Sequence, residues 1–205
     1  WFSPAGEGIY TSVILRPSIP PNEAPKLTLM ASVAVAEALL SLTSLKIKIK
    51  WPNDILIAGR KVAGILTEIS TDMDRIDYVV IGVGVNVNTP RKSLRPDIRL
   101  TATSVFMETG KVFPRIALLR AFLEWLEIYY EAFKTKGFDP ILNRWRHLAD
   151  IIGQRISVDL MDSVRVGKVL DVDKDGFLIL QDREGTIERI ISGDVTLLSQ
   201  DYGVV

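Results

Sequence analysis

The sequence contains no cysteine and only one histidine, His147, among its 205 residues. The lack of cysteine excludes disulfide bonds, thiolate nucleophiles and metal sites built from thiolates. A single imidazole cannot form the paired-histidine zinc motifs, and we predict that His147 is a solvated residue on a helix face. The side chains left for chemistry are mainly lysines, carboxylates and amides.

The chain also lacks net charge, because 25 Lys and Arg residues balance 25 Asp and Glu residues. Nothing global therefore draws it to nucleic acid or to an anionic membrane. No apolar run approaches the ~20 residues that span a bilayer, and no signal peptide is visible. We expect a cytoplasmic protein with no membrane segment, and its 47% of hydrophobic residues can form a globular core.

Strands are predicted wherever β-branched and apolar residues run together. Residues 9–15 and 78–88 each predict a strand, and residues 46–70 predict a strand, a corner and a hairpin. Helices are predicted at three places between these strands and after them, at residues 26–42, 114–136 and 139–148. This irregular order favours an α+β fold with a mixed sheet over regular βαβ winding.

The character of the chain changes near Gly153. Five short β-rich runs follow, and turn signals such as Asp175-Gly176 and Glu184-Gly185 separate them. About fifty residues of this kind predict a small antiparallel barrel or sandwich. We therefore predict two domains, residues 1–152 and 153–205.

The stretch from Lys46 to Ser70 carries cations at both ends of a strand pair that should be buried. Pro52 ends the first strand, and the next two strands fold back on each other. If the turn is Gly59-Arg60, Lys61 and Asp54 lie roughly 13 Å apart at strand rise. That distance is too long for a salt bridge, and it suits either solvated charges at the hairpin ends or two contacts with one elongated ligand.

Glycines inside buried strands indicate close approach of a ligand or of another backbone. Gly64 lies in one such strand, and Gly82 and Gly84 lie two apart on one face of another, with Asn86 in phase. An amide can both donate and accept hydrogen bonds, as recognition of an adenine edge requires. Tight packing of a helix across the glycines is the competing interpretation.

Several of these segments resemble the biotin protein ligases. The stretch KWPNDILIAGRKVAGILTE at residues 50–68 resembles the family's hallmark, and IGVGVNVN, ATSV and the first seventeen residues match further segments in the right order. The tail resembles the family's SH3-like C-terminal domain. The resemblance implies a catalytic domain related to class II aminoacyl-tRNA synthetases, with a mixed sheet and helices, followed by a small SH3-like β-barrel.

The resemblance implies that biotin and ATP form biotinyl-AMP, and that biotin then passes to a lysine of a biotin carboxyl carrier protein domain. Mg²⁺ assists this reaction in the family. By their match to family positions, Lys61, Asp54 and Lys50 are the expected catalytic residues, and Lys61, Gly64 and Leu66 are expected to bind biotin. The expected ATP-binding residues are Trp1, Asn53, Asn86 and Ala102.

Some expectations stay open at this point. The family carries a Ser/Thr-rich motif and an Arg/Gly-rich loop upstream of the Trp1 position, which this sequence does not include. A homodimer is left open, and DNA binding is expected only with an unseen N-terminal helix-turn-helix. A lipoate ligase of the same fold is the alternative enzyme, and a nucleic-acid-binding strand at Lys46–Lys50 is the non-enzymatic one. We expect the tail to take no part in adenylate formation, because Asp171, Asp173 and Asp175 at its crowded turn should simply be solvated.

Overall fold

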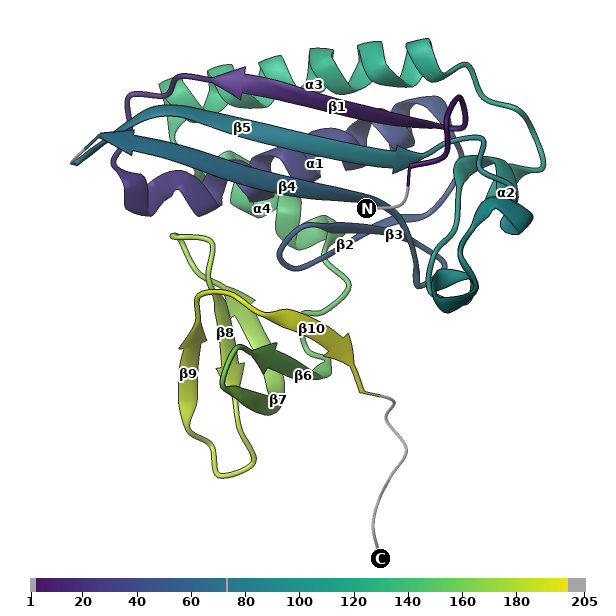
Figure 1. Cartoon of the computed structure of the whole chain (residues 1–205). Helices are drawn as coiled ribbons and strands as arrows, with labels where there is room; N and C mark the ends of the chain where they lie inside the picture. Colours follow the sequence, from purple (N-terminus) through teal and green to yellow (C-terminus); the bar gives the residue numbers. More distant parts are fainter. Residues whose placement is uncertain (1–2, 73, 199–205) are drawn as a thin grey trace, which may run out of the picture.

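The computed structural model describes residues 3–72 and 74–198, and it contains two β-sheets of five strands each (Figure 1). The larger sheet has the strand order β1-β5-β4-β3-β2. Its strands are β1 (Gly8–Leu15), β2 (Ile47–Lys50), β3 (Asp54–Ile57), β4 (Arg60–Asp72) and β5 (Arg75–Asn86). The predicted α+β class is confirmed. Every pair of named strands is antiparallel, and parallel pairing occurs at two isolated bridges, Ile49–Ala149 and Lys61–Ala102.

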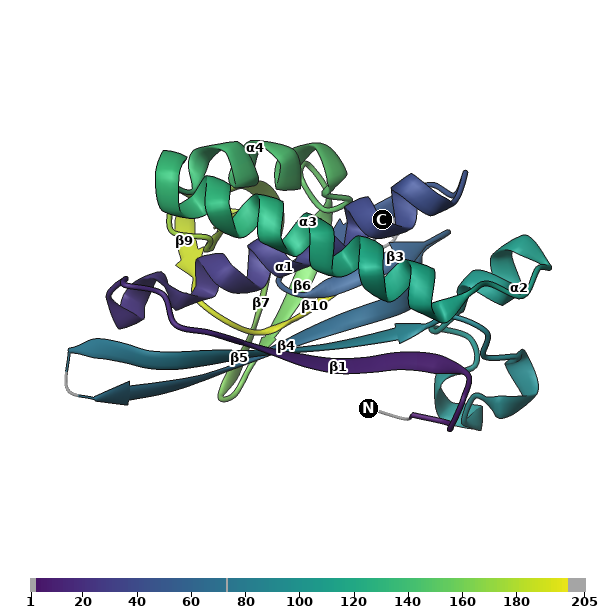
Figure 2. The same ribbon diagram turned by 90° about the horizontal axis from the view of Figure 1, so that it is seen from above.

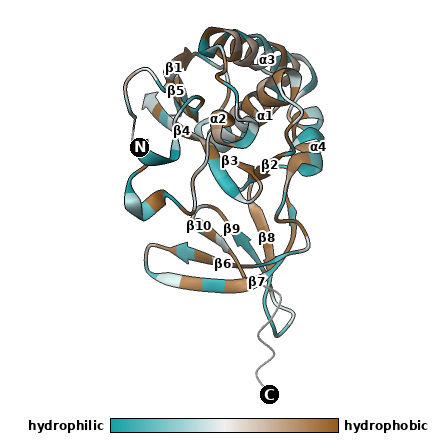
Figure 3. Cartoon of the chain, turned by 90° about the vertical axis from the view of Figure 1, so that its right-hand side faces the viewer, coloured by the Kyte–Doolittle hydropathy of each residue, from teal (hydrophilic) through white to brown (hydrophobic). Residues whose placement is uncertain are grey.

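Three helices cover one face of this sheet: α1 (Ala24–Leu42), α3 (Arg115–Lys136) and α4 (Asp139–Leu148) (Figure 2). Residues 21–42 are apolar and long enough to cross a membrane by length and composition, contrary to the expectation that no run approaches this length. This segment is nevertheless the core helix of the fold, because Leu27, Ala31 and Ala34 are fully buried. Figure 3 shows the same helix as an apolar element between the sheet and the other helices.

The residues predicted to begin and end the long helix lie at the two ends of α3. Pro114 is the N-cap residue of α3, one position before the helix begins, and Gly137 ends the helix with a φ of 76°. The connection after β5 contains two 3₁₀ turns, η2 (Arg91–Ser93) and η3 (Pro96–Ile98). It ends at the short helix α2 (Val105–Thr109). A further 3₁₀ turn, η1 (Pro21–Glu23), precedes α1.

The other face of the sheet is open around the glycines of β5. Val79, Ile81 and Val83 point into the core, whereas Gly82 and Gly84 alternate with them and face outward. Gly84 pairs with Gly64 on β4 and with Tyr10 on β1. The glycines therefore leave a shallow backbone surface, and the competing interpretation, a helix packed across them, is wrong.

The β3–β4 hairpin has a different register from the one predicted. Its turn is Ala58-Gly59, with φ values of 49° and 73°, so that Ile57 pairs with Arg60. Two positive φ values in succession fit the twist of a two-residue hairpin, and Ala58 gives no sequence signal for this conformation. A bulge follows, because Ile55 pairs with Ala63 while Leu56 pairs with Lys61.

The smaller sheet has the order β10-β6-β7-β8-β9 and is antiparallel throughout. All five predicted β-rich runs form strands: β6 (Arg155–Leu160), β7 (Ser163–Val172), β8 (Leu178–Gln181), β9 (Ile187–Ile190) and β10 (Asp194–Leu197). Their inward residues, which include Ile156, Val158, Val169 and Leu178, are buried and belong to the same hydrophobic cluster as the core of the large sheet. This is the predicted C-terminal β-domain, while its boundary at residue 152 stays a prediction.

Candidate active site

The corner between β2 and β3 is fastened to strand β4 by two hydrogen bonds. Trp51 and Pro52 are joined by a cis peptide bond, and Asn53 follows. The side-chain amide of Asn53 donates to the carbonyl of Ile65 at 2.8 Å, and the Ile65 N–H donates to the Asn53 carbonyl at 3.0 Å. Asn53 therefore braces the corner with one of its two side-chain N–H groups, and the ATP contact that the family resemblance implies for it stays a prediction.

Asp54 lies between two lysines directly after this corner. Its Oδ1 atom is 2.5 Å from Lys61 Nζ, and its Oδ2 atom is 3.4 Å from Lys50 Nζ. The prediction that Asp54 and Lys61 lie too far apart for a salt bridge is therefore wrong. The earlier turn and the bulge place Lys61 opposite Leu56, only two residues from Asp54, and a lysine side chain spans that distance.

The main chain of Lys61 is held on both sides by the segment before α2. The Lys61 N–H donates to the Thr101 carbonyl at 2.8 Å, and its carbonyl accepts from the Thr103 N–H at 2.8 Å. Arg60 pairs with Glu108 at 2.7 Å, and Glu108 also accepts from the Thr103 hydroxyl. Sequence reasoning missed the contacts of Arg60 and Lys61, because they join β4 to a distant segment of the chain without any local signal.

A groove of about 440 Å³ lies on the open face of the large sheet. Its floor is the glycine surface, including Gly64, Gly82 and Gly84, and Tyr10 and Leu66 form part of its walls. Leu66 is 64% exposed, which is unusual for a leucine in a strand and marks an apolar wall open to a ligand. We call this site the sheet groove, and it contains the sequence-predicted residues Gly64 and Leu66.

A second cavity, of about 700 Å³, lies beyond Lys61 and carries the charged groups. Ala102 and Asn86 line it beside Lys61, and Asn86 donates from Nδ2 to the Thr103 carbonyl at 3.0 Å. We call it the charged cavity. Its other lining residues include Lys50, Asp54, Arg95, Asp97 and Val195.

Lys61 lines both cavities, and so it stands at their boundary. An elongated ligand that fills the sheet groove with an apolar part and the charged cavity with an anionic part would pass this ammonium group. The structure therefore brings together the predicted residues Lys50, Asp54, Lys61, Gly64, Leu66, Asn86 and Ala102. Trp1 lies outside the described residues.

The remaining charged groups do not suggest another chemistry. His147 is exposed, as predicted, and its Nδ1 atom contacts the carbonyl of Asn143 in its own helix. Lys48 and Lys50 pair with Asp150 and Asp54, so two of the three lysines of the basic stretch are partnered by carboxylates, which disfavours a nucleic-acid-binding strand. Within residues 3–72 and 74–198, no group of three or more His, Cys, Asp or Glu side chains could hold a metal ion.

Two domain families match this chain. Residues 1–86 match the biotin/lipoate A/B protein ligase family, and residues 151–198 match the biotin protein ligase C-terminal domain. The chain is 38% identical over 197 residues to the bifunctional ligase/repressor BirA of Bacillus subtilis, covering 96% of this chain and 60% of that protein. It is 31% identical over 188 residues to the biotin–[acetyl-CoA-carboxylase] ligase of Paracoccus denitrificans, covering 90% of this chain and 78% of that protein.

The same similarity extends to solved structures. The biotin protein ligase of Aquifex aeolicus matches with a TM-score of 0.81 at 28% identity, covering 94% of this chain and 82% of that one. The same protein in complex with biotin and ATP matches with a TM-score of 0.80. The chain spans about 60% of the length of the BirA relatives that it matches.

Proposed function

This chain belongs to the biotin protein ligase family, and we propose that the protein activates biotin with ATP to biotinyl-5′-AMP and transfers biotin to a lysine of a carrier protein. The observation that carries this proposal is the position of Lys61 between the sheet groove and the charged cavity. Biotin has a bicyclic ring system with an apolar thioether side and a ureido edge, followed by an alkyl chain and a carboxylate, and ATP contributes the anionic phosphates. The sheet groove matches the ring system of biotin, and the charged cavity matches the phosphates of ATP, with the biotin carboxylate between them beside Lys61.

Activation brings the carboxylate of biotin against the α-phosphate of ATP, and both groups are anionic. A cation between them stabilises the approach and the charge that develops in the transition state. Lys61 supplies that cation, since its ammonium group lies at the boundary of the two cavities and its main chain is fixed at both the N–H and the carbonyl. The biotin oxygen attacks phosphorus, and pyrophosphate leaves, so no enzyme nucleophile is needed.

Nucleotide recognition falls to the charged cavity. Asn86 and Ala102 lie together on its wall, and the acceptor oxygen of the Asn86 amide can face an adenine edge while its nitrogen donates to Thr103. Lys50 and Arg95 supply positive charge to the same cavity. Gly64 and Leu66 serve biotin in the sheet groove, where bare backbone and apolar surface meet the ring system.

Magnesium fits this site as a partner of the nucleotide. Mg²⁺ is commonly bound through one or two carboxylates together with substrate phosphates. Asp97 is the lining carboxylate that would help to hold a hydrated ion carried in by ATP, since Asp54 is already paired with Lys50 and Lys61. The ion would neutralise phosphate charge when bound.

In the second step, Asp54 orients the acceptor lysine of the carrier. The incoming amine must lose its proton before it attacks the mixed anhydride. The two ammonium groups beside Asp54 oppose a third positive charge there, so they favour the neutral, nucleophilic amine. The carboxylate can still accept a hydrogen bond from that amine and aim it. The amine nitrogen then bonds to the biotinyl carbonyl carbon, AMP leaves, and the released protons pass to solvent.

The family also guides the wider expectations. We propose a biotin carboxyl carrier protein domain as the partner and the cytoplasm as the location, and homodimerisation remains a prediction. DNA binding is expected only if a helix-turn-helix precedes the residues described above. The alternative substrate, lipoate, shares the carboxylate and an apolar body with biotin, so charge alone does not discriminate between them.

The decisive experiment uses the protein expressed from its complete coding sequence. ATP is supplied with either biotin or lipoate, and pyrophosphate release and the mass of a purified carrier domain are followed. We expect pyrophosphate release and addition of one biotinyl group with biotin only. Modification of the carrier by lipoate, with biotin inert, would assign the chain to the alternative activity.

A further inference from the structure

We propose that the turn between β7 and β8 of the small domain, Asp173–Phe177, is a positioning element of the active site. Through the carbonyl of Gly176 it holds Trp51 at the corner that carries Asp54. This inference rests on the proposed ligase function, because the step that it affects is adenylate formation. It replaces the expectation that the tail takes no part in that step.

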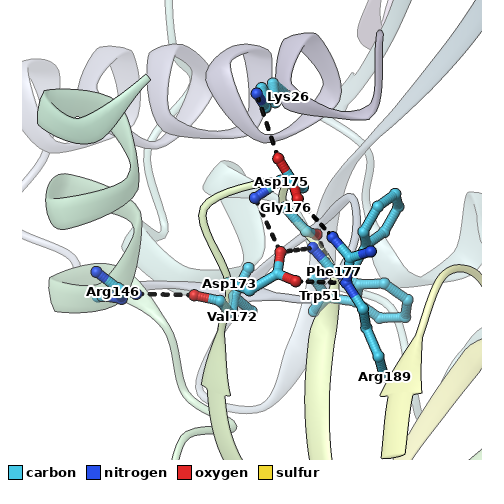
Figure 4. A network of polar contacts seen from close by, with 9 residues as sticks. All are labelled: Lys26, Trp51, Arg146, Val172, Asp173, Asp175, Gly176, Phe177 and Arg189. Atoms are coloured by element: carbon cyan, nitrogen blue, oxygen red, sulfur yellow. Dashed lines mark hydrogen bonds and ion pairs between the residues drawn. The ribbon is translucent and has the colours of Figure 1, made fainter. Parts of the chain in front are cut away.

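The contact at Trp51 is buried and specific. Trp51 is 1% exposed, and its Nε1 atom donates to the Gly176 carbonyl at 3.0 Å across 125 residues of sequence (Figure 4). Nε1 is the only polar atom of the indole, so this bond fixes the ring within a pocket that is otherwise held by packing. Asp54, three residues after Trp51, forms ion pairs with both Lys50 and Lys61.

The turn is built to present that carbonyl in one direction. Gly176 has a φ of 89°, in the region that favours glycine. Asp173 stabilises the turn, because its Oδ1 atom accepts from the N–H of Asp175 at 2.9 Å and from the N–H of Phe177 at 3.0 Å. Arg189 binds the second oxygen of Asp173 at 2.5 Å and lies over the Phe177 ring (Figure 4).

The aspartates in and beside this turn form ion pairs with basic side chains. The expectation that they are simply solvated is therefore wrong. Asp171, in β7 just before the turn, pairs with Arg146 at 2.6 Å, and Asp175 within the turn pairs with Lys26 of α1 at 3.6 Å. Lys26 is only 9% exposed, so the latter pair fixes the turn against the core helix of the large domain. The turn thus touches both the corner and the helix behind it.

A second link reaches the site from the same domain. Lys50 donates to the Val195 carbonyl at 3.1 Å while its ammonium group also lies beside Asp54. A continuous chain of polar contacts therefore runs from β10 through Lys50 and Asp54 to Lys61. Movement of the small domain would loosen Trp51 and Lys50 together and would leave the bonds between Asn53 and Ile65 intact.

The two cavities should respond differently to such loosening. The sheet groove is lined by β1, β4 and β5, and neither Trp51 nor Gly176 belongs to its described lining. Loss of the Trp51 contact should therefore slow adenylate formation and leave biotin affinity unchanged. If the Trp51 contact were purely structural, its loss would lower the stability of the protein and would not slow adenylate formation selectively while biotin affinity stays unchanged.

The first test compares Trp51→Phe with Trp145→Phe in the protein expressed from its complete coding sequence. Trp145 is also fully buried, but its Nε1 atom has no hydrogen-bond partner within the described part of the chain, so W145F is a matched control for loss of ring volume. We expect W51F to lower the single-turnover rate constant of pyrophosphate release about tenfold, the effect of one buried hydrogen bond. Biotin affinity by calorimetry should change less than about twofold, and W145F should leave both quantities at their wild-type values.

A second pair avoids the core. Arg189→Gln removes the charge that holds Asp173, and Arg165→Gln removes a similarly exposed arginine that pairs with Glu188 on the same domain. R189Q should lower the rate constant about threefold, as expected for a weakened, partly exposed charge pair, and R165Q should not. Wild-type rate constants in both W51F and R189Q would overturn the proposal, and R189Q alone decides if W51F does not fold.

Hydrogen exchange separates this inference from the proposed function. W51F should speed amide exchange in residues 54–57, and W145F should not, whether or not the protein releases pyrophosphate with biotin. Absence of pyrophosphate release in the wild type would contradict the ligase proposal alone. Unchanged exchange in W51F, together with an active wild type, would contradict the positioning role alone.

Discussion

Replacement of Lys61 by alanine should slow adenylate formation far more than it weakens ATP binding. Lys61 is the side chain that lines both cavities, and its Nζ atom lies 2.5 Å from Asp54 at their boundary. As the transition state forms, negative charge moves from the attacking carboxylate onto the phosphoryl oxygens and the leaving pyrophosphate, near this ammonium group. A contact that strengthens at that moment lowers the barrier rather than the binding free energy.

The magnitude follows from the charge and its exposure. Two unit charges 4 Å apart interact by about 4 kcal/mol at an effective dielectric constant of ~20, which corresponds to about three powers of ten in rate. The Lys61 side chain is 38% exposed and already shares Asp54, so water and the carboxylate reduce this value. We therefore expect the rate constant to fall about 10²- to 10³-fold.

Single-turnover pyrophosphate release with saturating biotin and ATP measures this rate constant directly. Lys48→Ala is the control, because Lys48 is 45% exposed in neighbouring β2, pairs with Asp150 and lies outside the described lining of both cavities. Lys61→Arg should recover only part of the rate, since a planar guanidinium cannot replace a compact point charge. An unchanged rate constant in K61A, or a rise in KM alone, would refute the transition-state role.

Four further predictions test other parts of the site. Asp54→Asn should slow biotin transfer to the carrier more than pyrophosphate release, as separate single-turnover assays of the two steps would measure. Asn86→Ala should weaken ATP binding about tenfold by calorimetry without changing biotin affinity, since it removes the amide proposed to face the adenine edge and the bond that holds it to the Thr103 carbonyl. Burial raises the pKa of Asp173, but hydrogen bonds from Arg189 and from two backbone N–H groups outweigh it and lower the pKa below 3.8. Its contribution to stability is therefore present above pH 3.8 and is lost as the pH falls through the lowered pKa, so urea unfolding between neutral pH and ~pH 3 should show a smaller loss for Asp173→Asn. Residues 91–99 should exchange amide protons more slowly once biotinyl-AMP is bound, and equal exchange would exclude their closure over the adenylate.

The helices and strands could be predicted because their signals are local. Pro114 and Gly137 bracket α3, and the turn signals at Gly176 and Gly185 separate the strands of the small sheet. Each of these residues acts through its own backbone preference, so no distant partner is needed to interpret it. The existence of each element follows from such signals and from the spacing of apolar residues.

The hairpin register could not be predicted in the same way. Ala58 adopts a positive φ that alanine rarely takes, and the bulge after Ile55 shifts the pairing again. The sequence-based distance between Asp54 and Lys61 was therefore wrong, although both residues had been selected. Asp54 and Lys61 could be selected by the chemistry of their side chains. The distance between them depends on the Ala58-Gly59 turn, which local sequence preferences do not specify.

The cations at the ends of a buried strand pair now have a physical reason. The ladder between β3 and β4 fixes the Cα atom of Lys61, and the Thr101 and Thr103 bonds fix its peptide groups. The interior of the hairpin can then be apolar and fully buried, while its polar ends meet at the boundary of the two cavities. Lys50 of the neighbouring strand β2 pairs with Asp54, and its hydrogen bond to the Val195 carbonyl connects this ion pair to the small domain. The charged groups are thus positioned by backbone pairing in the large sheet and by the contact of Lys50 with β10, an edge strand of the small sheet. Loss of either contact should therefore lower the rate of adenylate formation before it affects other properties.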